Sequence, residues 1–189
     1  MSEVVVKSLW EKRISRKLSK FSGILTAAIV ITATVGLAAC GAATYSESSG
    51  LPNTMLTPGA VNPAINQNNI DQTICVSGWT KTVRPPVSYT NSLKYKQLHE
   101  GYNLGGDTNM KDYEEDHIVP LEVGGNPSSP LNLFPEPRNI RLNSYLKDQL
   151  ENEIHLLVCH HQLSLKAGQA VFLNNWEDGY RKYVGKLPS

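Results

Sequence analysis

The sequence predicts an α+β fold, and three observations support that class. Apolar residues recur every three or four positions from Asn143 to Cys159, which is the period of a helix with one buried face. The segment 71–84 is rich in Thr, Val and Ile around a Ser-Gly turn and stops at two prolines, so it predicts a short strand or hairpin. Segment 118–121 predicts a second brief strand, broken by proline. The 189 residues suit one ordinary domain and a tail, without internal repeats.

The first forty residues differ in composition from the rest of the chain. Six basic and two acidic residues precede an uncharged run over 21–39, which is the pattern of a basic segment followed by the apolar part of a secretory signal. The run ends in Leu37 to Cys40, which resembles the lipobox of bacterial lipoproteins, where the cysteine is lipidated. We therefore expect a lipoprotein signal peptide over 1–40, lipidated at Cys40, with an uncleaved transmembrane anchor as the alternative. Both export the remainder and tether it to a membrane of the bacterial cell envelope.

The chain has three cysteines, and an odd number in an exported protein needs an explanation. If Cys40 carries lipid, Cys75 and Cys159 remain as a pair. A bridge between them would contribute on the order of 4 kcal/mol by constraining the unfolded chain. An oxidising compartment favours this disulfide over two buried free thiols.

The exported part, from residue 41 onward, is mildly acidic. It contains 12 Lys and Arg against 15 Asp and Glu, a formal charge of −3. Tight, purely electrostatic binding to phosphate backbones requires clustered Lys and Arg, so this balance counts against it. The balance leaves room for a site that holds its own cation.

The exported part divides into a tether and one domain. Residues 41–67 are rich in Ser, Thr, Asn, Pro and Gly without a sustained period, which predicts a flexible tether. We expect the domain over 68–189. It should contain a short helix capped by Ser92 and ending at Gly101, a later helix capped by Ser164, and a closing amphipathic segment with packed aromatic residues.

The helix that begins near Asn143 should have two faces. Asn143 suits the N-cap, because its side-chain oxygen can accept amide hydrogens of the first turn. Lys147, Glu151 and His155 follow at spacings of four and therefore share a polar face beside Asn143. An ordinary ion pair between Lys147 and Glu151 on a solvated face, contributing about 0.3–0.5 kcal/mol, is the alternative to a role in a site.

Several short motifs occur in the order typical of HNH nucleases. They are Asp116-His117, Pro120, Gly124-Gly125 and Asn132-Leu133, followed by the predicted helix. Together with NLFPEP, NSYLKDQLEN and HLLVC, they resemble small exported bacterial proteins of HNH type over most of 71–184. Four ordered blocks are more specific than a DH pair alone. The resemblance implies a ββα-metal hairpin-helix core, with additional short strands and C-terminal helices.

The resemblance also implies roles for the motif residues. His117 matches the base that activates water, and an ordinary imidazole pKa of about 6.5 leaves it neutral at physiological pH. Asp116 matches a metal ligand, and its hard oxygen suits Mg²⁺ or Mn²⁺, with Zn²⁺ as an alternative. Asn132 matches the asparagine that orients the histidine ring. The divalent cation would neutralise charge that develops on the phosphate.

The helix position of the motif has two candidates. Family spacing falls near Asn139, whereas the helix start offers Asn143, which we prefer as metal ligand. The face that carries Asn143 adds Lys147 as a contact to phosphate and Glu151 as a direct or indirect metal ligand.

Two other clusters have simpler explanations. A zinc site from segment 159–161 and His155 would lack a second paired motif, and Cys159 is expected in a disulfide. Glu114 and Glu115 could add affinity for a cation, but a solvated acidic run explains them more simply.

These features predict a membrane-tethered, extracytoplasmic, metal-dependent HNH-type endonuclease. Its expected partner is nucleic acid, as DNA and by the same chemistry RNA, with little sequence preference because no base-reading module is visible. The alternative is a non-catalytic envelope lipoprotein that uses a degenerate form of the fold for binding or structural work. The sequence predicts no oligomeric state.

Overall fold

The computed structural model describes residues 50–188. The predicted signal peptide, the lipidation at Cys40 and tether residues 41–49 lie outside this range. The helices are α2 (Trp79–Val83), α3 (Val87–His99), α4 (Ser144–Cys159), α5 (Leu165–Asn174) and α6 (Trp176–Tyr183). The strands are β1 (Tyr113–His117) and β2 (Leu133–Pro137), and three single turns of 3-10 helix are η1 (Ile70–Gln72), η2 (Met110–Asp112) and η3 (Leu121–Val123).

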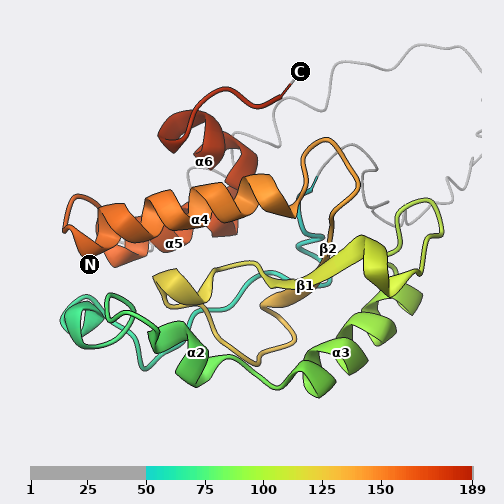
Figure 1. The fold of residues 1–189 in the computed structure, drawn as a ribbon, viewed down its shortest axis with the longest axis horizontal. Helices are drawn as coiled ribbons and strands as arrows, with labels where there is room; N and C mark the ends of the chain where they lie inside the picture. The colour runs from blue at the N-terminus through green and yellow to red at the C-terminus, as the bar shows by residue number, and fades with distance from the viewer. Residues whose placement is uncertain (1–49, 189) are drawn as a thin grey trace, which may run out of the picture. The chain divides into compact units, whose positions relative to one another are not determined.

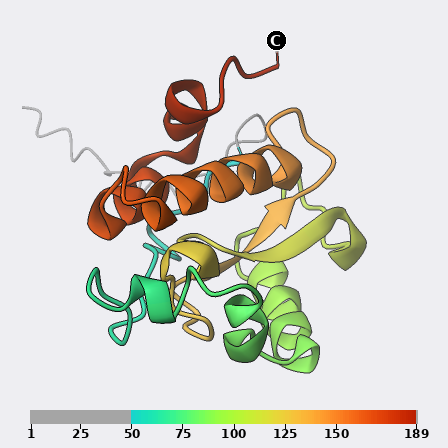
Figure 2. The same cartoon turned by 60° about the vertical axis from the view of Figure 1, so that its left-hand side comes forward.

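The two strands form a small antiparallel sheet, in which Asp116 pairs with Phe134 and His117 with Leu133. Figures 1 and 2 show this sheet between α4 and α3. Both strands of a two-stranded sheet are edges, which explains why β2 tolerates Pro135 and Pro137. Helices beside a small antiparallel sheet confirm the predicted α+β class. None of the helices in the described part is long and apolar enough to cross a membrane.

Neither of the two predicted strands lies where it was expected. In place of the strand predicted at 118–121, the acidic segment just before it forms β1, and 118–121 forms a buried turn that leads into η3. Pro120 has no N–H group to donate to a neighbouring strand. The N–H and the carbonyl of Val119 are both hydrogen-bonded to the Asn132 side chain, so they are not available to a neighbouring strand either. Segment 71–84 forms η1, turns and α2, because Gly78 adopts a left-handed conformation that breaks an extended chain.

The helix predicted from Ser92 begins earlier. Pro86 is the N-cap of α3, and a proline fixes a backbone angle suited to a helix start. Ser92 lies inside the helix and donates its hydroxyl to Ser88 O at 2.9 Å. α3 ends two residues before Gly101, so the predicted end is nearly correct.

The tether prediction is wrong for residues 50–67, which pack on the domain. Trp176 Nε1 donates to Gly50 O at 3.1 Å, and Val61 forms an isolated bridge with Gly125. Ile65 is buried in the main core. A polar, proline-rich composition does not exclude docking when the backbone finds long-range hydrogen-bond partners.

The buried face of α4 organises the core. Leu150, Ile154 and Val158 are fully buried, as their spacing predicts. α6 packs against α4, and its Trp176 and Tyr180 are buried in the same cluster. α5 begins at the predicted cap, where Ser164 accepts from Ala167 N at 3.3 Å.

The predicted disulfide between Cys75 and Cys159 is present, with the two Cα atoms 5.5 Å apart. It joins the turn after η1 to the last residue of α4. Because the two cysteines are 84 positions apart, the bridge closes a long loop and restricts the unfolded chain strongly.

Candidate metal centre

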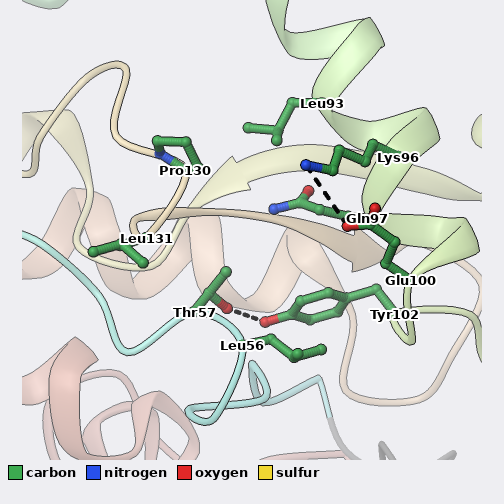
Figure 3. A pocket seen from close by; sticks show the side chains of 9 residues that line it. All are labelled: Leu56, Thr57, Leu93, Lys96, Gln97, Glu100, Tyr102, Pro130 and Leu131. Carbon is green, nitrogen blue, oxygen red and sulfur yellow. Dashed lines mark hydrogen bonds and ion pairs between the residues drawn. The ribbon is translucent and has the colours of Figure 1, made fainter.

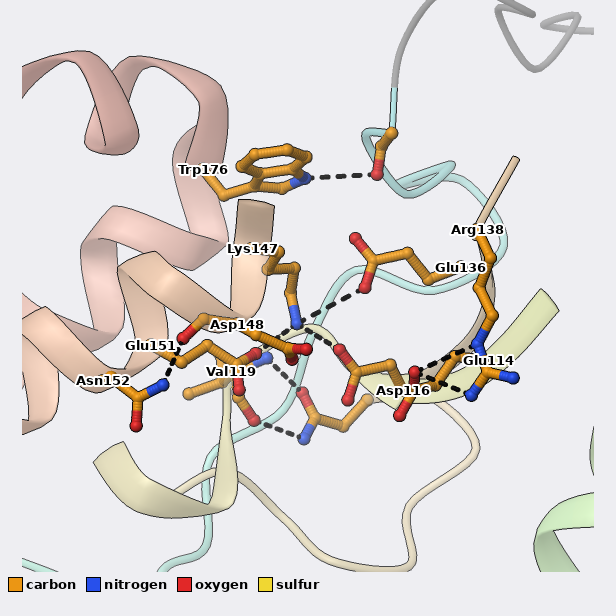
Figure 4. Close-up of polar contacts among 12 residues, drawn as sticks. Glu114, Asp116, Val119, Glu136, Arg138, Lys147, Asp148, Glu151, Asn152 and Trp176 are labelled. Atoms are coloured by element: carbon orange, nitrogen blue, oxygen red, sulfur yellow. Dashed lines mark hydrogen bonds and ion pairs between the residues drawn. The ribbon is translucent and has the colours of Figure 1, made fainter. Parts of the chain in front are cut away.

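A lysine and several carboxylates meet between β1 and α4. Asp116 is the next-to-last residue of β1, and Lys147 and Glu151 lie one turn apart on α4. Lys147 Nζ donates to Asp116 Oδ2 at 2.5 Å and also to Glu151 Oε1. Figure 4 shows the Lys147 amine directed toward Asp116. Three residues predicted for the site from the sequence therefore come together.

Lys147 is buried, with only 1% of its side chain exposed. The alternative of an ordinary ion pair on a solvated face is therefore wrong. Burial would lower the pKa of Lys147, but the carboxylates of Asp116, Glu151 and Glu136 outweigh that effect and raise it. Burial would raise the pKa of Asp116, but chiefly the Lys147 ammonium holds it below its usual range. The pair is ionised, and a buried ion pair persists only where its hydrogen bonds are satisfied.

One ammonium does not balance the carboxyl groups around it. Glu136, on β2, is fully buried, and neither of its side-chain oxygens accepts a hydrogen bond from a donor in the described part of the chain. The Asp116 carboxylate lies beside it and can accept a hydrogen bond from a protonated Glu136. Lys147 Nζ lies 3.8 Å from Glu136 Oε2. Burial raises the pKa of Glu136 and of Glu151 despite the attraction of Lys147, and repulsion from Asp116 adds to the rise. Ionising every carboxyl group of the cluster would therefore require more positive charge than Lys147 supplies.

Three carboxylates are placed to hold an additional cation. One oxygen each from Asp116, Asp148 and Glu151 lies within 4.8 Å of the others. Burial, followed by repulsion from Asp116, raises the pKa of Asp148 to about 6. Carboxylate oxygens suit Mg²⁺ or Mn²⁺ better than Zn²⁺, which favours nitrogen and sulfur. The residues present therefore fit a hard divalent cation.

Asp148 is missing from the set predicted from the sequence. It precedes Glu151 by three positions, a spacing that places two helical side chains on one face. That spacing is a signal that could have identified Asp148 once Glu151 was chosen.

The two asparagine candidates differ in their surroundings. Asn143 is the N-cap of α4 in backbone conformation, but its side chain makes no capping hydrogen bond, so that part of the prediction is wrong. Its Oδ1 atom is buried without a hydrogen-bond partner among residues 50–188. Asn139 is exposed and donates from Nδ2 to Asp112 Oδ1 at 2.5 Å. Asn143 thus keeps an acceptor free for a ligand role, whereas Asn139 is engaged elsewhere.

His117 ends β1 with its ring held by the loop between the strands. Its Nε2 lies 2.9 Å from Pro127 O. A carbonyl oxygen only accepts, so Nε2 carries the hydrogen and Nδ1 keeps its lone pair. Burial lowers the pKa of His117, with opposition from the Asp116 carboxylate, so the ring is neutral at pH 7. A neutral imidazole with one unprotonated nitrogen is the form that a general base requires.

Asn132 does not orient the ring directly, which corrects the role expected for it. Its Nδ2 donates to Val119 O and Asn126 O, both at 3.0 Å, and its Oδ1 accepts from Val119 N and Ala60 N. These bonds hold the loop that contains the Pro127 carbonyl. A Cβ on Gly125 would lie 1.7 Å from Val119 O, so the second glycine of the pair is required for this close approach.

Glu114 and Glu115 do not form a solvated acidic run. Glu114 accepts from Arg138 Nη2 at 2.9 Å. Both oxygens of Glu115 are buried without hydrogen-bond partners in the described range, and burial raises its pKa to about 8 against the attraction of Lys94. The two neighbours point to opposite faces of β1, as strand geometry requires.

Glu115→Gln should remove a pH-dependent loss of stability. Because the pKa of Glu115 rises from 4.5 to about 8 on folding, the folded state binds more protons and its stability falls as pH rises across this window. We expect the variant to match wild type near pH 4.5 and to exceed it by up to about 4–5 kcal/mol near pH 8.5. Urea unfolding at both pH values measures this. The exposed Glu100→Gln should leave the pH profile unchanged, and parallel profiles for Glu115→Gln and wild type would contradict the argument.

Other clusters do not compete with this centre. Cys159 is bonded to Cys75, so it is not free for the zinc site considered with His155, although the three side chains lie close together. A pocket of about 170 Å³ lies beside α3, lined by Gln97 and Tyr102 among others (Figure 3), and it contains none of the predicted site residues.

Comparison of the chain with protein-family models, with curated proteins and with solved structures finds no match. The interpretation of the centre therefore depends on its own geometry and on the motif order of the sequence.

Proposed function

We propose that this protein is a metal-dependent endonuclease of the HNH type, with a ββα-metal core formed by β1, β2 and α4. The observation that carries the proposal is the group of carboxylates from Asp116, Asp148 and Glu151, with the neutral His117 at the end of the strand that carries Asp116. Because neighbours on a strand point to opposite faces, Asp116 and His117 can serve one phosphate only from the end of β1, where His117 is the last residue. A base and a set of hard ligands are the two requirements for hydrolysing a phosphodiester with water.

In this proposal His117 is the general base, and the carboxylates hold the cation that neutralises charge. Nδ1 of His117 accepts the proton of the attacking water, while the Pro127 carbonyl keeps Nε2 protonated and the ring in place. Asp116, Asp148 and Glu151 would hold Mg²⁺ or Mn²⁺, with Asn143 as a further oxygen donor. The bound cation supplies charge neutralisation at the phosphate and leaving oxygen. Lys147 orients Asp116 and Glu151 through its two hydrogen bonds.

The substrate in this proposal is nucleic acid outside the cytoplasm. Phosphodiester chemistry is common to DNA and RNA, and the centre itself contacts a phosphate rather than base edges, which favours low sequence preference. Export through the N-terminal segment and anchoring through Cys40 belong to the same proposal, based on the sequence pattern of residues 1–40.

Cleavage of plasmid DNA by the purified full chain tests the proposal. We expect nicking and linearisation with Mg²⁺ or Mn²⁺, little cutting with Zn²⁺, and none with excess chelator, because three carboxylates prefer hard cations. Gel electrophoresis over time measures the rates. Intact plasmid and intact single-stranded DNA and RNA in every metal would refute nuclease activity.

A second candidate function has its own supporting observation. The Lys147 ammonium already bridges Asp116 and Glu151 in the position of a bound cation. This arrangement favours a non-catalytic envelope lipoprotein in which the ion cluster is structural. Failure of Mn²⁺ to bind the centre, together with intact substrates, would support this alternative.

A further inference from the structure

A polar pocket of about 390 Å³ lies between the segment leading into α2, η3 and the middle of α4, the helix that carries Asp148 and Glu151. Its lining includes Ser77, Trp79, Thr80, Glu122, Asn152 and His155. None of these residues has a role in the proposed hydrolysis. We propose that this pocket receives one unstacked nucleobase that carries an exocyclic amino group, next to the phosphate that is cut. The proposal rests on the nuclease function and gives that function a preference for single-stranded over duplex nucleic acid.

Helix α4 contributes residues both to the pocket and to the centre. Asn152 follows the proposed ligand Glu151 on α4, and its Nδ2 donates to Asp148 O at 2.8 Å. Glu122 belongs to η3, which packs on α4, and its charge contributes to the raised pKa of Asp148 and Glu151. A nucleotide whose phosphate lies at the cluster therefore has the pocket within reach of its base.

The chemistry of the lining matches a base rather than a phosphate. Glu122 Oε2 is buried without a hydrogen-bond partner in the described part of the chain, and His155 Nδ1 lies 4.0 Å from it. A carboxylate oxygen is an acceptor that suits the amino group of cytosine, and it repels phosphate. Trp79 supplies an aromatic surface for stacking, which works with every base. Asn152 also lines the pocket, and its side-chain amide contains an acceptor oxygen.

α2 connects the pocket to the catalytic histidine. Trp79 begins the helix, and Arg84 follows its last residue. Five residues of helix span about 7.5 Å, which is within the reach of a single nucleotide. Arg84 is exposed, and its charge acts on His117. Trp79, at the start of α2, can thus stack on a base, while the Arg84 guanidinium, at its end, can contact a backbone phosphate.

A base inside a duplex is stacked and paired, so it cannot enter the pocket without being extruded. We therefore expect the protein to cut single-stranded oligonucleotides faster than the same sequence in a duplex. Among single strands, those of cytosine should be cut faster than those of thymine, which lacks an exocyclic amino group.

The test measures kcat/KM for a single-stranded cytosine oligonucleotide with one cleavable position and for its copy lacking the base beside that position. For wild type, removal of this base should lower kcat/KM about tenfold or more, since stacking on an aromatic side chain is lost. Trp79→Ala and Asn152→Ala should lower kcat/KM for the intact strand. On the abasic strand both variants should have the kcat/KM of wild type, because the pocket residues contribute only when a base is present to bind them. Trp79→Phe should retain most of the preference.

The outcomes separate the two proposals. If wild type cuts intact, abasic, single-stranded and duplex substrates at equal rates, the base pocket is refuted while the nuclease stands. Equal losses on the intact and abasic strands in Asn152→Ala would also refute it. If wild type cuts nothing, the nuclease proposal fails first, and the pocket proposal falls with it. The exposed Asn174→Ala, on α5, is the matched control and should behave as wild type.

Discussion

His117→Ala should lower the rate of metal-dependent DNA cleavage by about 100- to 10,000-fold. The variant loses the only group of the proposed centre that is neutral and ready to accept a proton, while Asp116, Asp148 and Glu151 keep their carboxylates. Binding of Mn²⁺ should therefore persist, and a calorimetric titration measures it separately from cleavage. Loss of activity with retained metal binding would identify His117 as the base.

The control for this variant is His160→Ala, which alters an exposed histidine at the end of α4 and should leave the rate unchanged. Comparable far-UV circular dichroism of the three proteins excludes loss of fold as the cause. If His117→Ala cuts as fast as wild type, the proposed mechanism is wrong even where the protein is a nuclease.

Lys147→Met should destabilise the protein by about 3–5 kcal/mol at pH 7.5 in the presence of chelator. Methionine has a similar length but no charge, so Asp116 and Glu151 would remain buried without their counter-ion. Denaturant unfolding measures the loss. Added Mn²⁺ should then stabilise the variant more than wild type, because the cation binds the folded state and meets no competing ammonium.

The exposed Lys166→Met, on α5, provides the comparison and should change stability by less than about 0.5 kcal/mol. If Lys147→Met is as stable as wild type at neutral pH, Lys147 does not compensate the cluster. An unchanged response to Mn²⁺ in a destabilised variant would instead support the structural ion cluster of the second candidate function.

Local patterns in the sequence predicted the elements that depend on neighbours along the chain. The apolar period of α4 identified Leu150, Ile154 and Val158 as buried, and Ser164 marked the start of α5. The same reasoning failed over 71–84, where the residues prefer strands but no strand among residues 50–188 is available to pair with them. A strand needs hydrogen bonds to a second segment, and composition does not show whether one exists.

The candidate centre was predicted in part for a similar reason. Asp116 and Glu151 were predicted for one site and do lie close together, whereas Asp148 was not predicted. Asn132 was expected to contact the His117 ring, but its side chain bonds to the backbone of Val119 instead. Motif order identifies which residues share a region of the fold. It does not show which atoms meet, since the partners of Asn132 include Ala60, which lies 72 positions away.

The sequence by itself determined the α+β class, the buried face of α4 and the Cys75–Cys159 pairing. These follow from residue types and spacings that act over one or two turns, or from the small number of cysteines. Asp116 and His117 were selected through the resemblance to HNH nucleases, and Lys147 through its position on the polar face of the helix. The tertiary structure alone decided that Lys147 is buried among unbalanced carboxylates, that Pro127 holds the ring of His117, and that 50–67 packs on the domain. These features depend on segments far apart in the chain, where burial changes the energy of a charge and no local pattern records it.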